Sequence, residues 1–275
     1  MTGRIEIAAG GLRAVLAPEW GGRMLRLSHA EAGDLLHPLE ADVFDPLRWP
    51  KGGAYPLFPY HGRIAQAAFP WEGQEVRLDP HPDASPHSLH GPAHKAVWEL
   101  TERGADAATL RHRHRPDRDW PWGFEAVQRF RLSDAGLEVG LRIVNTDARA
   151  MPAGIGWHPY FPKAADLATD AACNWPHDAA GLPTGQRQPP GDLRGGTVSL
   201  SDWSRVDLSL PCARLRIEAS ATLGHLVIHD PPAYTCVEPV SHVSNAPNLP
   251  VKPPFAMTFL APGASLEGEV RVSFV

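Results

Sequence analysis

Hydrophobic and polar residues alternate along much of the chain. Across residues 137–143 every second position is Leu, Val or Ile, while Glu, Gly and Arg fill the positions between them, and residues 266–274 repeat the pattern with Leu266, Val270, Val272 and Phe274 on one side. A period of two places each set on its own face of an extended strand, so both segments are predicted to be half-buried strands. Shorter runs predict further strands at residues 5–7, 12–16, 24–27, 75–78, 96–101, 107–112, 124–132, 215–219, 226–229 and 257–260.

Turn-forming residues separate these strands. Pro (29) and Gly (25) are frequent among the 275 residues, which argues against long helices. Gly10-Gly11 predicts a hairpin, and residues 163–173 are the one candidate for a short helix. We therefore predict an all-β fold, a large antiparallel β-sandwich forming a single domain over residues 1–275. Residues 176–196 lack periodicity, and we interpret them as a functional loop rather than a domain linker.

Net charge, cysteine count and the lengths of apolar runs indicate what kind of molecule the protein binds and where it is found. The formal net charge of -5 offers no general attraction for nucleic acid or an anionic membrane. Three cysteines without close spacing indicate neither a disulfide framework nor a CxxC metal site, which fits a reducing compartment. The first twenty residues lack a signal-peptide pattern, and no stretch approaches the ~18 apolar residues of a membrane span. We expect a soluble cytoplasmic protein that binds a small molecule.

Two segments combine a titratable residue with an unusual backbone. Gly154-Ile-Gly-Trp-His158-Pro-Tyr-Phe161 places a His among aromatic residues, where it either serves a site or is satisfied within an aromatic core. Thr235-Cys-Val-Glu238-Pro-Val places a Glu in an apolar run, where it is either an exposed edge residue or a buried functional group. If Glu238 is buried, desolvation raises the pKa of its carboxyl toward a value useful for a general base.

Two other segments give weaker indications of a functional site. His87-Ser-Leu-His90-Gly-Pro-Ala-His94 has histidine spacing similar to a metal site, but Pro86 and Gly91-Pro92 exclude helical presentation, and no acidic or Cys ligand is nearby. A loop that presents His90 as a hydrogen-bond donor is favoured. The basic run at residues 111–118 is flanked by Asp residues, which favours a solvated strand end over nucleic-acid contact. No GxSxG, P-loop or strand-linked GxGxxG motif is present.

Four segments in order together resemble the aldose 1-epimerase (galactose mutarotase-like) family. Pro59-Tyr-His-Gly-Arg63-Ile64 is similar to its Pro…Asn-Arg-Ile segment, and Leu89-His90-Gly91 to its Leu-His-Gly. A strand pair leading to His158-Pro-Tyr-Phe161 follows, and then Glu238-Pro with Asn245-Ala-Pro-Asn248. Each motif is weak alone, but their order makes the match specific.

The resemblance implies a β-sandwich whose concave face binds a sugar. It implies Glu238 as general base and His158 as general acid, with Arg63, His90 and Tyr160 holding sugar hydroxyls. The implied reaction is interconversion of the α and β anomers of a free aldose by ring opening, which involves no redox change and needs no cofactor or metal.

Two departures from the family pattern bear on the substrate. Gly62 stands where the family has an Asn before the Arg, and the family's sugar-binding Asp is represented by Asp202 or Asp207 or by neither. An epimerase for sugar phosphates remains an alternative, and it would require a cationic pocket. A non-catalytic carbohydrate-binding module is another, although it would have no need for both acid and base. Monomer and homodimer are both open.

Overall fold

The computed structural model describes residues 3–48 and 50–275. Within them the chain forms twenty-four strands and six short 3-10 turns, without an α-helix. This confirms the all-β prediction. No helix in the described residues is long and apolar enough to span a membrane.

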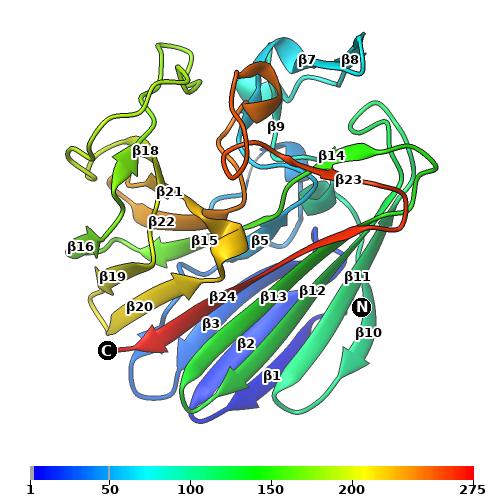
Figure 1. The fold of residues 1–275 in the computed structure, drawn as a ribbon. Coiled ribbons are helices and arrows are strands. Elements are labelled where there is room, and N and C mark those ends of the chain that lie inside the picture. Colours follow the sequence, from blue (N-terminus) through cyan, green and yellow to red (C-terminus); the bar gives the residue numbers. More distant parts are fainter. Residues whose placement is uncertain (1–2, 49) are drawn as a thin grey trace.

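A ten-stranded antiparallel sheet carries most of the features discussed below. Its central strands lie above β24 and β13 of the other large sheet in Figure 1. Its strands, in spatial order, are β1 (Ile5–Ala9), β2 (Leu12–Ala17), β3 (Arg23–His29), β5 (Ala54–Leu57), β15 (Gly156–Pro162), β22 (Tyr234–Val240), β21 (His225–His229), β18 (Thr197–Ser201) and β17 (Cys173–Asn174), with β4 (Gly33–Asp34) beside β3. The Gly10-Gly11 hairpin is confirmed as the turn between β1 and β2.

An eight-stranded antiparallel sheet packs against the first. In spatial order its strands are β10 (Glu99–Arg103), β11 (Ala107–His114), β12 (Phe124–Ser133), β13 (Gly136–Asn145), β24 (Ser265–Phe274), β20 (Arg214–Ala219), β19 (Arg205–Ser209) and β16 (Asp166–Thr169). Buried and less buried residues alternate along β13 as predicted. On β24 the alternation also holds at Val270 and Val272, but Phe274 is exposed at the strand end. One apolar cluster contains residues of both sheets and forms the core.

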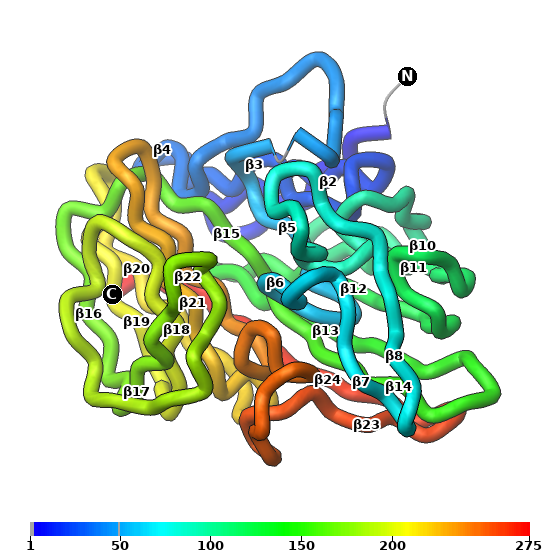
Figure 2. Tube along the Cα trace, turned by 90° about the horizontal axis from the view of Figure 1, so that it is seen from above, coloured from blue at the N-terminus to red at the C-terminus, as the bar shows by residue number. Residues whose placement is uncertain are grey.

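Three short strand pairs and the 3-10 turns belong to the connections. The pairs are β6 (Arg63–Ile64) with β9 (Ser88–Leu89), β7 (Ala68–Trp71) with β8 (Gln74–Arg77), and β14 (Met151–Ala153) with β23 (Thr258–Leu260). The turns are η1 (Pro46–Arg48), η2 (Ala65–Ala67), η3 (Pro82–Ala84), η4 (Ala93–Lys95), η5 (Ala221–Leu223) and η6 (Ala246–Asn248). Seen from above, β6 lies near the centre of the molecule (Figure 2).

The short helix predicted at residues 163–173 is wrong. Asp166–Thr169 forms strand β16, which pairs with β19 at the edge of the eight-stranded sheet. The carboxylate of Asp170 then accepts hydrogen bonds from the backbone N–H groups of Ser204 and Arg205, which fixes the end of this strand pair. Tertiary pairing therefore overrides a weak local helix preference.

Residues 176–196 form an irregular connection between β17 and β18. An isolated bridge pairs Gln188 with Asn174, and a second one, between His177 and Pro183, lies within the segment. This segment is yellow-green beside β18 in Figure 2. Its far end is held by Asp230, whose buried carboxylate contacts Arg194 Nε at 3.0 Å and Lys163 Nζ at 2.7 Å. The loop is thus anchored next to the ten-stranded sheet.

Candidate active site

One face of the ten-stranded sheet carries two rows of side chains that cross four neighbouring strands, β15, β22, β21 and β18. The first row is His158, Glu238, Val227 and Ser199, and the second is Tyr160, Cys236, His229 and Thr197. Because side chains two apart on a strand share a face, the antiparallel register brings residues from distant parts of the chain together.

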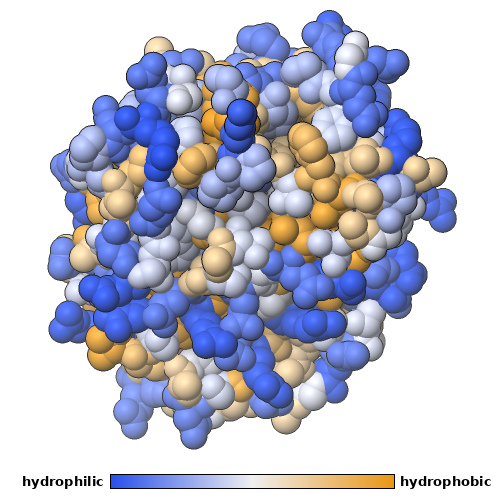
Figure 3. Space-filling model, in the orientation of Figure 1, coloured by the Kyte–Doolittle hydropathy of each residue, from blue (hydrophilic) through white to orange (hydrophobic). Residues whose placement is uncertain are grey.

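All of these side chains except Cys236 line the floor of a cavity of about 310 Å³. Its other walls come from the segment that contains β6, from β9, and from the loop of residues 176–196. Figure 3 shows the molecule in the orientation of Figure 1, with hydrophilic residues dominating the outline. Five of the six site residues predicted from the sequence line this cavity: Glu238, His158, Arg63, His90 and Tyr160.

Glu238 and His158 are in direct contact inside the cavity. Glu238 Oε1 lies 3.2 Å from His158 Nε2, and their side chains are 5% and 3% exposed. Burial raises the pKa of Glu238 to about 8, while the positive charge of Lys51 opposes that rise. Burial, together with the nearby His90 and Arg23, holds the pKa of His158 well below its usual value. The arrangement therefore stores one proton at neutral pH, on the carboxyl group.

Aromatic rings fix the orientation of His158. Its imidazole stacks on Tyr160, with ring centroids 4.8 Å apart, and on Tyr55 at 4.5 Å. The buried guanidinium of Arg23 lies over the ring of Tyr55, with Cζ 4.3 Å from its centroid. His158 Nδ1 has no hydrogen-bond partner among the described residues, so stacking on the two rings and the contact of Nε2 with Glu238 orient the imidazole.

His90 is held by the backbone of Gly62. The Gly62 N–H donates to His90 Nδ1 at 3.1 Å, which leaves the proton of the neutral imidazole on Nε2. Burial lowers the pKa of His90 well below its usual value, so the ring is uncharged near neutral pH. His90 is thereby prepared to donate a hydrogen bond through Nε2, the role that the sequence favoured.

The space beside Gly62 is filled by Ser244. Its φ is +65°, and a Cβ there would lie 2.2 Å from Ser244 Oγ. Ser244 lines the cavity, and its hydroxyl accepts a hydrogen bond from the Arg63 N–H at 3.0 Å. The hydroxyl of Ser244 thus occupies the space that a side chain at position 62 would need.

Asp202, the sixth predicted residue, is not among the described residues that line the cavity. Its carboxylate pairs with Arg187 at 2.5 Å, and nearly half of its side chain is exposed. The other candidate, Asp207, lies on β19 of the opposite sheet and pairs with Arg216. Neither carboxylate joins the cavity.

Several lining residues were missed by sequence reasoning. Lys51 precedes Gly52-Gly53 with no motif to distinguish it, and it lines the cavity while remaining exposed. Two hydrogen-bonded pairs lie at the β18 and β21 side of the floor: Thr197 Oγ1 with His229 Nδ1 at 2.8 Å, and Ser199 Oγ with His177 Nε2 at 2.9 Å. The alternate positions 197 and 199, and 227 and 229, were the available signal, but pairing of β18 with β21 was needed to interpret it.

Within the described residues, no group of three or more His, Cys, Asp or Glu side chains is arranged to hold a metal ion. The histidines near His90 instead contact aromatic rings. His94 lies 5.3 Å from Tyr55, and His90 lies 5.4 Å from His158, measured between ring centroids. What the cavity offers is a carboxyl–imidazole pair surrounded by hydrogen-bonding and cationic groups.

Solved structures establish the class of fold. A galactose mutarotase-like protein from Clostridium acetobutylicum superimposes with a TM-score of 0.88 at 20% identity, covering 99% of this chain and 95% of that one. The GalM/aldose epimerase homologue from C. elegans gives a TM-score of 0.84 at 18% identity over the whole of both chains. At these identities the likeness concerns the fold alone.

The sequence places the chain in a family. A model of the aldose 1-epimerase family matches residues 3–209, and the chain belongs to this family. YphB of Escherichia coli strain K12 is 30% identical over 145 residues, which are 50% of this chain and 49% of that protein. YihR of the same strain is 30% identical over 106 residues, 38% of this chain and 34% of YihR. The chain spans about half, or less, of the length of these curated relatives.

Proposed function

We propose that the protein is an aldose 1-epimerase, or mutarotase, that interconverts the α and β anomers of an aldose. The observation that supports this most directly is the buried contact of 3.2 Å between Glu238 and His158 in a cavity of about 310 Å³. Small-molecule sites of roughly 300–1,000 Å³ are typical, so the cavity suits one sugar ring. Family membership supports the same chemistry.

The reaction needs one base and one acid. Glu238 removes the proton of the C1 hydroxyl, whose electrons form the C1=O1 double bond. The C1–ring oxygen bond breaks, and His158 donates a proton to that oxygen. After rotation about the C1–C2 bond, the reverse transfers close the ring on the other face of C1. The elements of the sugar are conserved, and both residues return to their starting protonation states.

The stored proton matches this requirement. Near neutral pH it resides on Glu238, because burial raises the pKa of that carboxyl to about 8. Moving it to His158 across the contact of 3.2 Å leaves a carboxylate base and an imidazolium acid, the forms that the reaction uses. His90, Arg63 and Tyr160 lie in the same cavity, where they bind hydroxyl groups and stabilise the open-chain carbonyl oxygen.

Polarimetry on freshly dissolved α-anomers of glucose, galactose, arabinose and fucose tests the proposal. Each positioned acid or base contributes about 10²–10⁴-fold, so Glu238→Gln and His158→Ala should each lower kcat by that factor while the Kd for sugar changes little. Glu218→Gln, an exposed carboxyl on β20, serves as the matched control and should retain the wild-type rate. Sugar binding without acceleration by the wild-type protein would instead indicate a binding module.

A further inference from the structure

The charges that line the cavity are unbalanced. Of the described lining residues, Arg63 and Lys51 are the basic side chains of Arg and Lys type, and Glu238 is the single carboxylic acid. Partial burial lowers the pKa of Lys51 to about 8, so its ammonium group is mostly charged at pH 7 and loses that charge as pH rises through 8. Glu238 is mostly uncharged near neutral pH, because burial raises its pKa to about 8. Asp202, which could have supplied a second carboxylate, pairs with Arg187 outside the cavity. The ligand-free cavity is therefore cationic.

Lys51 is held at the cavity by its neighbours. Arg23 donates a hydrogen bond from Nη1 to the Gly52 carbonyl oxygen at 3.0 Å, and the Gly53 carbonyl accepts from the Tyr160 N–H at 2.9 Å. Gly53 has φ +66°, and a Cβ there would lie 2.1 Å from the Met24 carbonyl oxygen. The backbone beside Lys51 is thus pinned to β15, directly next to a floor residue of the site.

Arg63 is held with similar precision on another wall. It lies on β6, which pairs with β9, and its N–H donates to Ser244 Oγ. Its guanidinium reaches the loop of residues 176–196, where a Cβ on Gly181 would lie 3.0 Å from Nη1. Lys51 and Arg63 both act electrostatically on His90 and on His229, so the two positive charges converge on the same space.

We propose that the substrate is an aldose with an anionic substituent, a phosphate or a carboxylate, which Lys51 and Arg63 bind together. The proposal rests on the epimerase function above, and it names the class of sugar. The anionic group lies away from C1, because C1 must meet Glu238 and His158. Charge-assisted hydrogen bonds to an anion are about twice as strong as neutral ones, and the hydroxyls of Thr197 and Ser199 supply further donors.

Exchange NMR between the α and β anomeric protons tests this at equilibrium. Three matched sugars are compared: glucose, glucose 6-phosphate and glucuronate, followed by the galactose series. We expect kcat/KM for a charged sugar to exceed that of its neutral parent at least about tenfold. Raising KCl from ~50 to ~500 mM should lower kcat/KM for the charged sugar only, because salt screens the attraction. The charged sugar with the higher kcat/KM shows whether the anionic substituent is a phosphate or a carboxylate.

Lysine variants separate this inference from the proposed function. Lys51→Met should bring the charged-to-neutral ratio of kcat/KM toward one, whereas Lys252→Met, which alters an exposed lysine outside the cavity, should preserve it. Neutral sugars turned over as well as charged ones, or a ratio unchanged by Lys51→Met, would overturn the anionic substrate and leave the epimerase function standing. Failure to accelerate any of the sugars would overturn both.

Discussion

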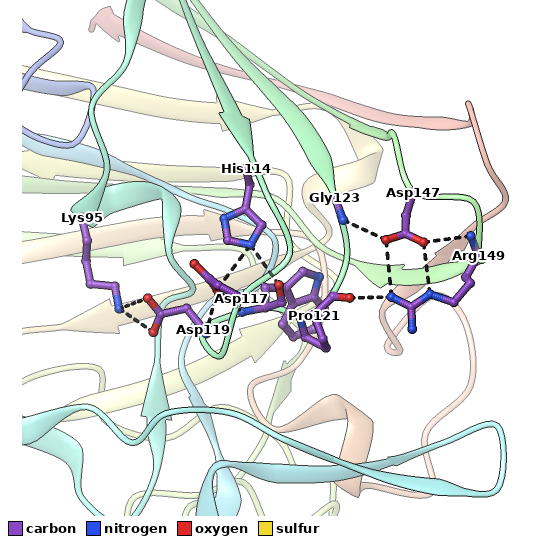
Figure 4. A network of polar contacts seen from close by, with 9 residues as sticks. Lys95, His114, Asp117, Asp119, Pro121, Gly123, Asp147 and Arg149 are labelled. Carbon is purple, nitrogen blue, oxygen red and sulfur yellow. Dashed lines mark hydrogen bonds and ion pairs between the residues drawn. The ribbon is translucent and has the colours of Figure 1, made fainter.

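Glu238 and Asp147 are both largely buried carboxyl groups, but they are surrounded differently. Asp147 accepts hydrogen bonds from Arg149 Nε at 3.1 Å and from the N–H groups of Gly123 and Arg149 at 3.1 and 3.0 Å (Figure 4). The bond to Arg149 is the main cause of the lowered pKa of Asp147. Glu238 contacts His158, and burial raises its pKa.

The difference separates a carboxylate that stabilises the fold from a carboxyl group that can exchange a proton. Asp147 joins the turn after β13 to the turn before β12, and its charge is neutralised by Arg149 and by the backbone N–H of Gly123. Glu238 keeps its proton near neutral pH because burial raises its pKa to about 8, and its polar contact is with His158, a group that can accept that proton. Perturbed carboxyl groups of this second kind are typical of functional sites.

The largest expected effect concerns stability. In the native protein Glu238 keeps its proton up to pH of about 8, whereas the unfolded chain releases it near pH 4.5. The native state therefore holds one more proton between these values, and the free energy of unfolding falls with pH by up to about 1.4 kcal/mol per unit through this group. Glu238→Gln has no such proton to lose, so its free energy of unfolding should not fall with pH through this group. Urea unfolding at pH 5, 6.5 and 8 should show the stability of the variant rising relative to that of the wild type as pH increases. A stability difference that stays the same at all three pH values would contradict the raised pKa of Glu238.

A smaller effect is expected in the rate. The acid and base together need one proton, which leaves the buried pair above pH of about 8. For a neutral aldose, kcat/KM should be level from pH 6 to about 7, fall to about half near pH 8 and then fall about tenfold per unit, because kcat/KM reports the ionisation of the free enzyme. Exchange NMR, corrected for the spontaneous reaction, measures this profile. A kcat/KM that continues to rise above pH 9 would mean that the pair acts without its proton.

The smallest effect is expected for Asp147, the paired carboxylate. Asp147→Asn keeps an oxygen acceptor for the Gly123 N–H but loses the charged contact with Arg149, which should cost about 1 kcal/mol at pH 7. Because the pKa of Asp147 is lowered, its contribution is present above the unfolded value and is lost as pH falls below about 4. Urea unfolding at pH 7, 5 and 3.5 tests this, and a cost that grows with acidity would reverse the interpretation.

Strands with one side toward solvent were more predictable than strands buried on both faces. Strands β13 and β24 expose one face, so alternating residues identify them directly. Strands β5 and β22 are buried almost throughout, because one face meets the core and the other meets the cavity region. Such strands show no alternation: β5 was not predicted from the sequence, and β22 was indicated only as an apolar run with an unexpected Glu.

The site was predictable where residue type and local backbone agree. Glu238 beside Pro239 and His158 beside Pro159 were noticeable because each is unusual in an apolar strand. Lys51 was not, because its place at the cavity depends on contacts between its glycine neighbours and Arg23 and Tyr160, which are distant in sequence. Asp202 was suggested by its position after the loop, but its pairing with Arg187 is a tertiary choice that no motif records.

The position of β24 has a consequence for how the protein folds during synthesis. This strand, at residues 265–274, lies between β13 and β20 and forms hydrogen bonds with both. Until β24 has been synthesised, β13 and β20 each lack their partner on that side, and unpaired edges of backbone N–H and C=O groups favour aggregation. The eight-stranded sheet therefore stays open at its middle until residues 265–274 have been made.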